Sequence, residues 1–227
     1  TTFATMDGSA AGHLILNNGS STTTSGTSNY IAGLNAGAAI ASGGNYNTLI
    51  GENAGTAITT TDENTAVGYN AMVATVVGGV DSAIRNVAVG AGALSTNTTG
   101  SYNTAVGTYA LLSNDTGTYN TAVGQGALYV NDAGYNTAVG QYAMGGNTTG
   151  TNNVAVGNNA LDAANNGSYN VAVGKNALSA NTASYNTALG YAAGAAVTTG
   201  YPNILIGYQA DASAVDSANQ IVIGNSI

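Results

Sequence analysis

The chain has 227 residues, only 5% of which are charged, and its formal net charge is −8 with just two Lys or Arg side chains. Nucleic-acid binding is excluded because it requires several Lys or Arg to neutralise phosphates, and the same deficit disfavours anionic membrane surfaces. The chain has no cysteine, which excludes disulfides and thiol chemistry, and no apolar run approaches the roughly 20 residues of a membrane span.

Residues 1–28 lack a regular pattern, and we predict that they form an N-terminal capping or connecting segment. A pentad of consensus N-[TV]-A-[VL]-G then recurs through residues 29–227, which we predict to form one repetitive domain. Copies begin at Asn29, Asn47, Asn64, Asn86, Asn103, Asn120, Asn136, Asn153, Asn170, Asn186, Asn203 and Gln220. Successive starts are 16–18 residues apart, except for one interval of 22 residues that contains an insertion at residues 73–85.

Each pentad predicts a short strand, because Thr, Val, Ile and Leu favour the pleated conformation. Side chains alternate along a strand, so Thr104 and Val106 point to one side and Ala105 to the other. A small Ala suits the interior of a narrow coil, and the larger residue at the fourth position is therefore predicted to face outward.

The rest of each repeat predicts a second short strand and then a polar turn. The second strand is predicted at Ala110-Leu111, Ala127-Leu128, Ala160-Leu161 and Ala177-Leu178. The polar return carries Asn97, Asn114, Asn131, Asn147 and Asn181. Asn and the Gly residues that follow it tolerate the left-handed conformations of turns.

A period of 16–17 residues is too short for a helix-containing repeat and predicts an all-β parallel solenoid of about 12 coils. Equivalent residues of successive coils would then stack about 4.8 Å apart. Two ladders are predicted, one of Asn side-chain amides bonded along the stack and one of Tyr rings. Their members are Asn64, Asn86, Asn103, Asn120, Asn136, Asn153, Asn170, Asn186, Tyr102, Tyr119, Tyr135, Tyr169 and Tyr185.

The outward aliphatic row indicates association between copies of the chain. Left exposed, it would exceed the patch of roughly a few hundred Å² that a monomer tolerates, and packing copies around an axis would cover it. The predicted interface consists of Val67, Val89, Val106, Val123, Val139, Val156, Val173, Leu189, Ile206 and Ile223. The alternative is a monomeric solenoid that turns this row inward beside Ala.

Residues that could carry chemistry are few. His13 is the only histidine and has no evident partners for catalysis or metal binding. Glu52, Asp62 and Glu63 are the carboxylates most suited to cleaving a glycan, although most acids lie at predicted turns. The recurrent Thr at the second pentad position would suit ice binding, but Val or Ile interrupts that row. We therefore predict a protein that is not an enzyme and uses no metal or cofactor.

The N-T-A-V-G-x-x-A units resemble the head repeats of trimeric autotransporter adhesins, and their longer Tyr-, Asn- and Gly-rich form resembles repeats of bacteriophage tail fibres. The resemblance covers about residues 29–227. It implies a left-handed parallel β-roll assembled as a homotrimer, with the aliphatic row lining the interior of the trimer. The units here are longer than those usual in adhesin heads.

These observations lead us to expect an extracellular segment of a virion tail fibre or a bacterial surface, presenting a rigid trimeric rod for attachment. Its partners would be its own copies and a host-surface glycan or protein, with Arg85, Tyr109, Tyr142 and Tyr208 as candidate ligand contacts. The insertion at residues 73–85 is either a binding loop or a tolerated surface insertion. The alternatives are a bacterial adhesin, a purely structural filament subunit and, more remotely, a glycan depolymerase.

Overall fold

The computed structural model describes residues 28–40, 43–74, 83–163 and 167–225, together with two short strands nearer the N-terminus. Most of the predicted capping segment and most of the insertion at 73–85 lie outside the described residues, as does His13. The chain divides into two compact units, Thr1–Thr118 and Tyr119–Ile227. The described part of the chain contains strands and turns and no helix, so it holds no helix that could cross a membrane.

Short strands recur through both units. The first unit contains β1 (Thr5–Met6), β2 (Leu14–Leu16), β3 (Tyr30–Ala32), β4 (Thr48–Ile50), β5 (Thr65–Val67), β6 (Val87–Val89) and β7 (Thr104–Val106). The second contains β8 (Thr121–Val123), β9 (Thr137–Val139), β10 (Val154–Val156), β11 (Val171–Val173), β12 (Thr187–Leu189), β13 (Asn203–Ile206) and β14 (Gln220–Ile223). Each pentad from Asn47 onward therefore contributes one strand, at the place the sequence predicts.

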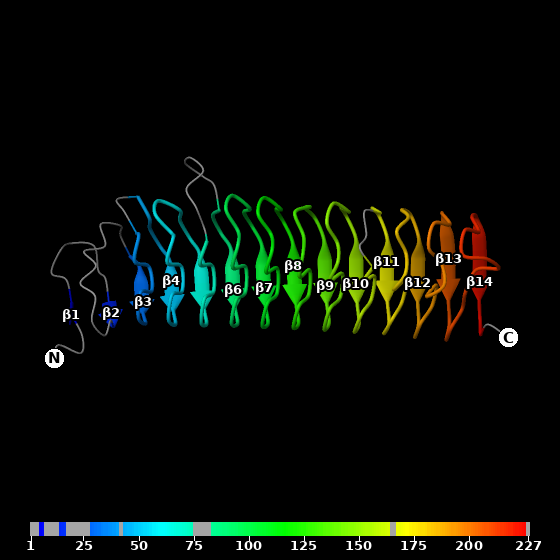
Figure 1. The fold of residues 1–227 in the computed structure, drawn as a ribbon, viewed down its shortest axis with the longest axis horizontal. Helices are drawn as coiled ribbons and strands as arrows, with labels where there is room; N and C mark the ends of the chain where they lie inside the picture. Colours follow the sequence, from blue (N-terminus) through cyan, green and yellow to red (C-terminus); the bar gives the residue numbers. More distant parts are fainter. Residues whose placement is uncertain are drawn as a thin grey trace. The chain divides into compact units, whose positions relative to one another are not determined.

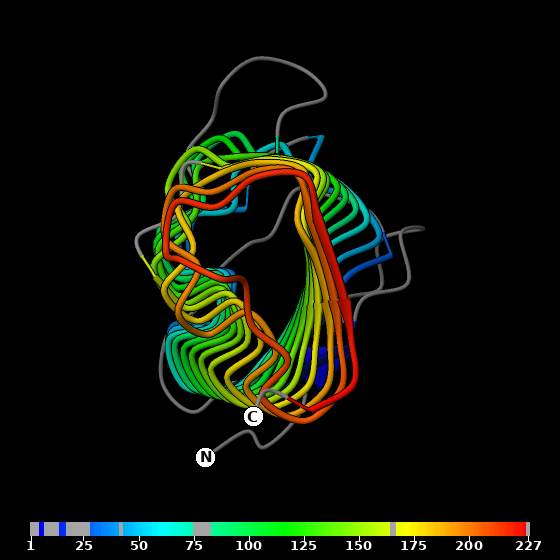
Figure 2. The same cartoon turned by 90° about the vertical axis from the view of Figure 1, so that its right-hand side faces the viewer.

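Each unit is a parallel β-solenoid. Among the described strands, β1 and β2 alone pair antiparallel; from β2 to β7 and from β8 to β14, successive strands pair parallel. The register aligns equivalent pentad positions, as where Ala155 pairs with both Ala138 and Ala172. Figures 1 and 2 show successive turns of each unit lying over one another, with the strands on one side of the coil.

The chain forms about 11 turns, one fewer than the roughly 12 coils predicted. The sequence estimate counted pentads, whereas a turn runs from one strand to the next. Twelve strands from β3 to β14 therefore bound eleven intervals. The all-β class, the parallel solenoid and the repeat are confirmed.

The interior of the coil is filled by the middle residue of each strand, as predicted from the alternation of side chains. Ala66, Ala105 and Ala138 are completely buried, and so is Leu49, which takes the same position in β4. A second buried row comes from the Leu or Met that follows most pentads, including Leu128 and Met144. Small and branched side chains thus alternate around a narrow core, which accounts for the high Ala content.

The prediction of a second short strand at the Ala-Leu pairs is wrong, because these residues form turns. Leu128 and Leu161 have φ of 50° and 52°, so the backbone leaves the extended conformation there. Backbone hydrogen bonds still join neighbouring turns at this point, as from Leu128 N to Ala143 O at 3.0 Å. A corner that inserts Leu into the core therefore replaces a strand without losing the inter-turn bonding.

The Gly that closes each pentad lies where neighbouring turns approach each other closely. Gly140 has a φ of 136°, and a Cβ added there would lie 2.5 Å from the carbonyl oxygen of Gly157 in the next turn. A side chain is thus excluded both by the conformation and by the neighbouring backbone. The sequence pattern predicted this role for the recurrent Gly.

Candidate functional site

The outward face of the strands carries the predicted interface row. Val106, Val123, Val139 and Val156 are 36–37% exposed, although the Ala beside each of them is fully buried. Val67, Val89, Val173 and Ile206 are half-buried, whereas Leu189 and Ile223 are more exposed. The structure aligns these side chains along the strands of each unit, and it contains one copy of the chain.

The second pentad position adds apolar side chains to the same face, and these residues are not part of the predicted interface. In the second unit, where this position is not Thr, it is occupied by Val154, Val171, Ile204 or Ile221, all exposed. The i, i+2 alternation of a strand places them on the same side as the fourth position. The face of β10, β11, β13 and β14 is therefore more apolar than the predicted row alone.

The first-position Asn residues form a buried row that joins successive turns. Asn136 donates from Nδ2 to the carbonyl oxygen of Gly150 at 2.8 Å, and its Oδ1 accepts from the backbone N–H of Asn153 at 3.0 Å. Its own N–H donates to Oδ1 of Asn120 at 3.0 Å. The amides thus bond mainly to the backbone, and less to one another than predicted. Buried polar groups are stable because they are hydrogen-bonded in this way.

A second buried Asn row was predicted only as a polar return. Asn97, Asn114, Asn131, Asn147 and Asn181 are fully buried. Asn114 donates to Oδ1 of Asn97 at 3.0 Å and to the carbonyl oxygen of Gly117 at 3.0 Å. The signal was in the sequence, because an Asn fixed at one repeat position has a structural role that a solvated turn does not require.

The Tyr residues that precede the buried Asn lie at exposed corners with positive φ. Tyr119 stacks on Tyr135 with ring centroids 5.1 Å apart, and Tyr169 stacks on Tyr185 at 5.2 Å. Asn152 takes the position between Tyr135 and Tyr169, so the stacked rings of the second unit occur as pairs. In the first unit, Tyr102 instead contacts Arg85.

The four candidate ligand contacts are engaged with neighbouring turns. The ring of Tyr109 lies against Gly92, the ring of Tyr142 lies against Gly126, and Tyr208 stacks on Tyr191 at 5.3 Å. Arg85 donates from Nε to Oε2 of Glu63 at 2.8 Å and from Nη1 to the hydroxyl of Tyr102 at 2.6 Å.

The ion pair between Arg85 and Glu63 also shifts the pKa of both side chains. The hydrogen bond from the Arg85 guanidinium lowers the pKa of the Glu63 carboxyl and, in return, raises the pKa of Arg85. Asp62 accepts from the backbone N–H of Asn45 at 2.6 Å. These acids therefore serve local contacts, and no cluster of three or more potential metal ligands occurs among the described residues.

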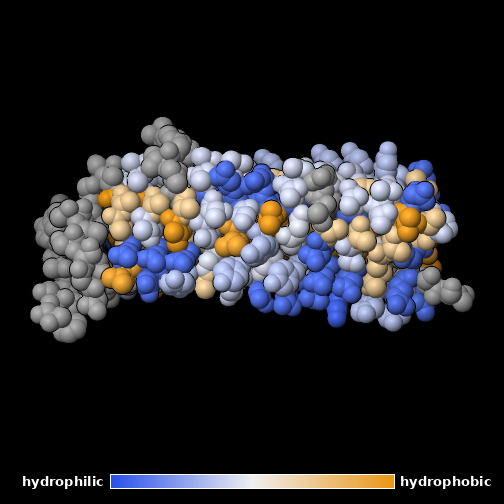
Figure 3. Space-filling model, viewed as in Figure 1, coloured by the Kyte–Doolittle hydropathy of each residue, from blue (hydrophilic) through white to orange (hydrophobic). Residues whose placement is uncertain are grey.

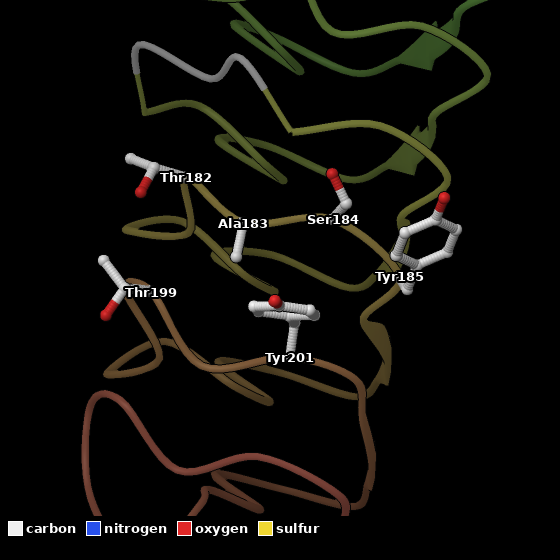
Figure 4. A pocket seen from close by; sticks show the side chains of 6 residues that line it. All are labelled: Thr182, Ala183, Ser184, Tyr185, Thr199 and Tyr201. Carbon is white, nitrogen blue, oxygen red and sulfur yellow. The ribbon is translucent and has the colours of Figure 1, made fainter.

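A pocket of about 410 Å³ lies in the second unit, at the corners that precede β12 and β13. It is lined by Thr182, Ala183, Ser184, Tyr185, Thr199 and Tyr201. Figure 4 shows the Tyr201 ring edge-on below Ala183, with Tyr185 to one side and the threonines at the other. None of these residues was singled out as a ligand contact from the sequence, because a pocket between turns leaves no periodic signal.

The surface around these features is polar but hardly charged. On the face drawn in Figure 3, hydrophobic and hydrophilic residues are interspersed. Because only 5% of residues are charged, the hydrophilic groups are mostly hydroxyls and amides. No family model matches the chain, and no curated protein or solved structure is significantly similar to it.

Proposed function

We propose that the chain is a non-enzymatic structural segment of an extracellular fibre or adhesin head, in which three copies of a left-handed roll associate through their strand faces. The exposed aliphatic row carries this proposal, since no charged residue interrupts the strands of either unit. Monomers rarely expose a contiguous apolar patch of this kind, and cyclic assembly would remove it from water. The resemblance of the repeats to trimeric adhesin heads and tail-fibre repeats supports three as the number of copies.

Attachment would follow from repetition of the turns that remain outside the assembly. Each copy presents the same hydroxyl-, amide- and tyrosine-rich corners, so a weak contact occurs three times. Multivalency then raises the overall affinity without a strong single site. A virion tail fibre is the first proposal and a bacterial trimeric adhesin is the second; a purely structural filament would share the assembly but have no receptor.

Sedimentation equilibrium tests the assembly directly. The wild-type chain is expected at three times its monomer mass of 22.1 kDa. The double variant Val123→Asp with Val156→Asp puts charge on the strand face and is expected to sediment as a monomer that keeps its β circular dichroism. Val130→Asp is the matched control, because Val130 is also 37% exposed but lies in the turn between β8 and β9.

A monomeric wild-type chain at all concentrations would contradict the proposal, as would trimers that survive the double substitution. The non-enzymatic part has its own test. Incubation with bacterial surface polysaccharides is expected to release no new reducing ends, and their release would contradict it.

A further inference from the structure

The pocket between Tyr185 and Tyr201 exists because the aromatic row changes register there. Tyr185 directly precedes the buried Asn186, and its ring stacks on Tyr169 with an interplanar angle of 2°. In the next turn, Pro202 occupies that position before Asn203, and the tyrosine is one residue earlier, at Tyr201. The Tyr201 ring therefore lies out of line with the row and forms one wall of the open space shown in Figure 4.

The walls of the pocket combine the exposed rings of two tyrosines with the hydroxyl groups of neighbouring residues. Tyr201 and Tyr185 are 57% and 56% exposed. Thr182 Oγ1 donates to the carbonyl oxygen of Thr198 at 3.0 Å, which leaves its lone pairs to accept from a ligand. Ser184 Oγ instead accepts from the backbone N–H of Ser168 in the preceding turn at 2.9 Å, and Figure 4 shows it pointing away from Tyr201.

This lining matches the two surfaces of a sugar ring. The C–H groups of a pyranose form an apolar face that can lie on a tyrosine ring, while its hydroxyl groups both donate and accept hydrogen bonds. The volume of about 410 Å³ falls within the range of about 300–1,000 Å³ that is usual for small-ligand pockets. No charged residue lines the pocket, and the net charge of −8 disfavours acidic sugars.

We infer that this pocket binds a neutral pyranose residue of a surface glycan, with the Tyr201 ring as its platform and Thr182 and Thr199 as hydrogen-bonding partners. The inference rests on the proposed function for its biological setting, since it gives the attachment segment a ligand class. In a trimer the pocket would occur three times, so millimolar affinity at one copy would suffice for attachment.

Binding is tested with the full chain on a glycan array that carries neutral, sialylated and sulfated glycans, followed by saturation-transfer NMR with the methyl pyranoside of the best neutral hit. We expect binding to neutral glycans and a loss of at least tenfold in Tyr201→Ala. Tyr69→Ala is the matched control, because Tyr69 is 56% exposed and lies in the other unit. Ala183→Leu should also abolish binding, because it fills the pocket without removing a hydrogen-bonding group.

The same samples are measured by sedimentation equilibrium, so the two proposals fail separately. A trimer that binds no neutral glycan, binds only acidic glycans, or binds equally after Tyr201→Ala and Ala183→Leu overturns the sugar site and leaves the assembly intact. A monomer whose binding is lost in both pocket variants overturns the assembly and supports the site.

Discussion

Residues that are neighbours in a strand point to opposite faces of the coil, and the two faces are under different constraints. In β9, Ala138 is fully buried, whereas Val139 is 37% exposed. The inner position is limited by the opposite wall of the same coil, and its hydrogen-bonding neighbours are the backbones of adjacent turns. The outer position borders only the equivalent residues of adjacent strands, such as Val123 and Val156, and otherwise faces outward. Inner rows thus define the fold, and outer rows are available to define what the protein binds.

The largest expected effect comes from a position where two turns approach each other closely. Gly140→Ala should destabilise the second unit by at least about 3 kcal/mol, because it combines a disfavoured φ with a clash against Gly157. Urea unfolding at fixed protein concentration measures the change. Gly224→Ala is the control, because Gly224 has a similar φ of 131° but no atom within 4 Å of an added Cβ among the described residues.

For Gly224→Ala we expect a cost of about 1 kcal/mol from the backbone conformation alone. If the two substitutions cost the same, contact between turns is not what fixes Gly at this position. The cost at both positions would then come from the positive φ of the backbone and not from a clash with the next turn.

The buried Asn row should follow in magnitude. Asn136→Ala leaves the buried N–H of Asn153 without its acceptor and opens a cavity, so we expect a loss of about 2–4 kcal/mol by urea unfolding. Asn158→Ala removes hydrogen bonds at the surface to Gln141 and to the neighbouring Asn159, and should cost less than about 0.5 kcal/mol. Equal losses for the two variants would show that the interior position has no special role.

A matched pair within β9 separates the two faces most directly. Ala138→Val overfills the coil and should cost about 1–3 kcal/mol. Val139→Thr keeps the shape of an outward side chain and should change the stability of the isolated chain by less than about 0.5 kcal/mol. Thermal unfolding of both variants at the same concentration checks the order, and a reversed order would contradict the assignment of the faces.

The smallest effect is expected at the exposed corner of the first unit. Because Arg85 lowers the pKa of Glu63 in the folded state, the pair stabilises the fold above the ordinary pKa of Glu and loses this effect as the pH falls through the lowered value. The Glu63→Gln variant should therefore be slightly less stable than the wild type at neutral pH, and its stability should equal that of the wild type in strong acid. Unfolding curves across this pH range measure the difference, and a gap that widens in acid would contradict it.

Sequence periodicity predicted the strands, their register and their buried Ala, because these depend on contacts that repeat in every turn. It missed the left-handed corner at Leu128, since an Ala-Leu pair carries no signal that separates a strand from a turn whose side chain enters the core. It also missed the bonding of Asn136 to backbone rather than to other amides. The pocket at Tyr201 was beyond prediction, because it arises where the repeat is broken and depends on the neighbouring turn.

The in-register pairing of each turn with the turns before and after it has a consequence for how such a chain can vary. When a turn contacts only its neighbours, stability is approximately a sum of nearest-neighbour terms. Removing or duplicating one complete repeat of 16–17 residues then brings equivalent surfaces of two turns together, and the contacts among the other turns are kept. Recombination between DNA segments that encode equivalent repeats would in this way lengthen or shorten the protein in whole steps without passing through a misfolded form.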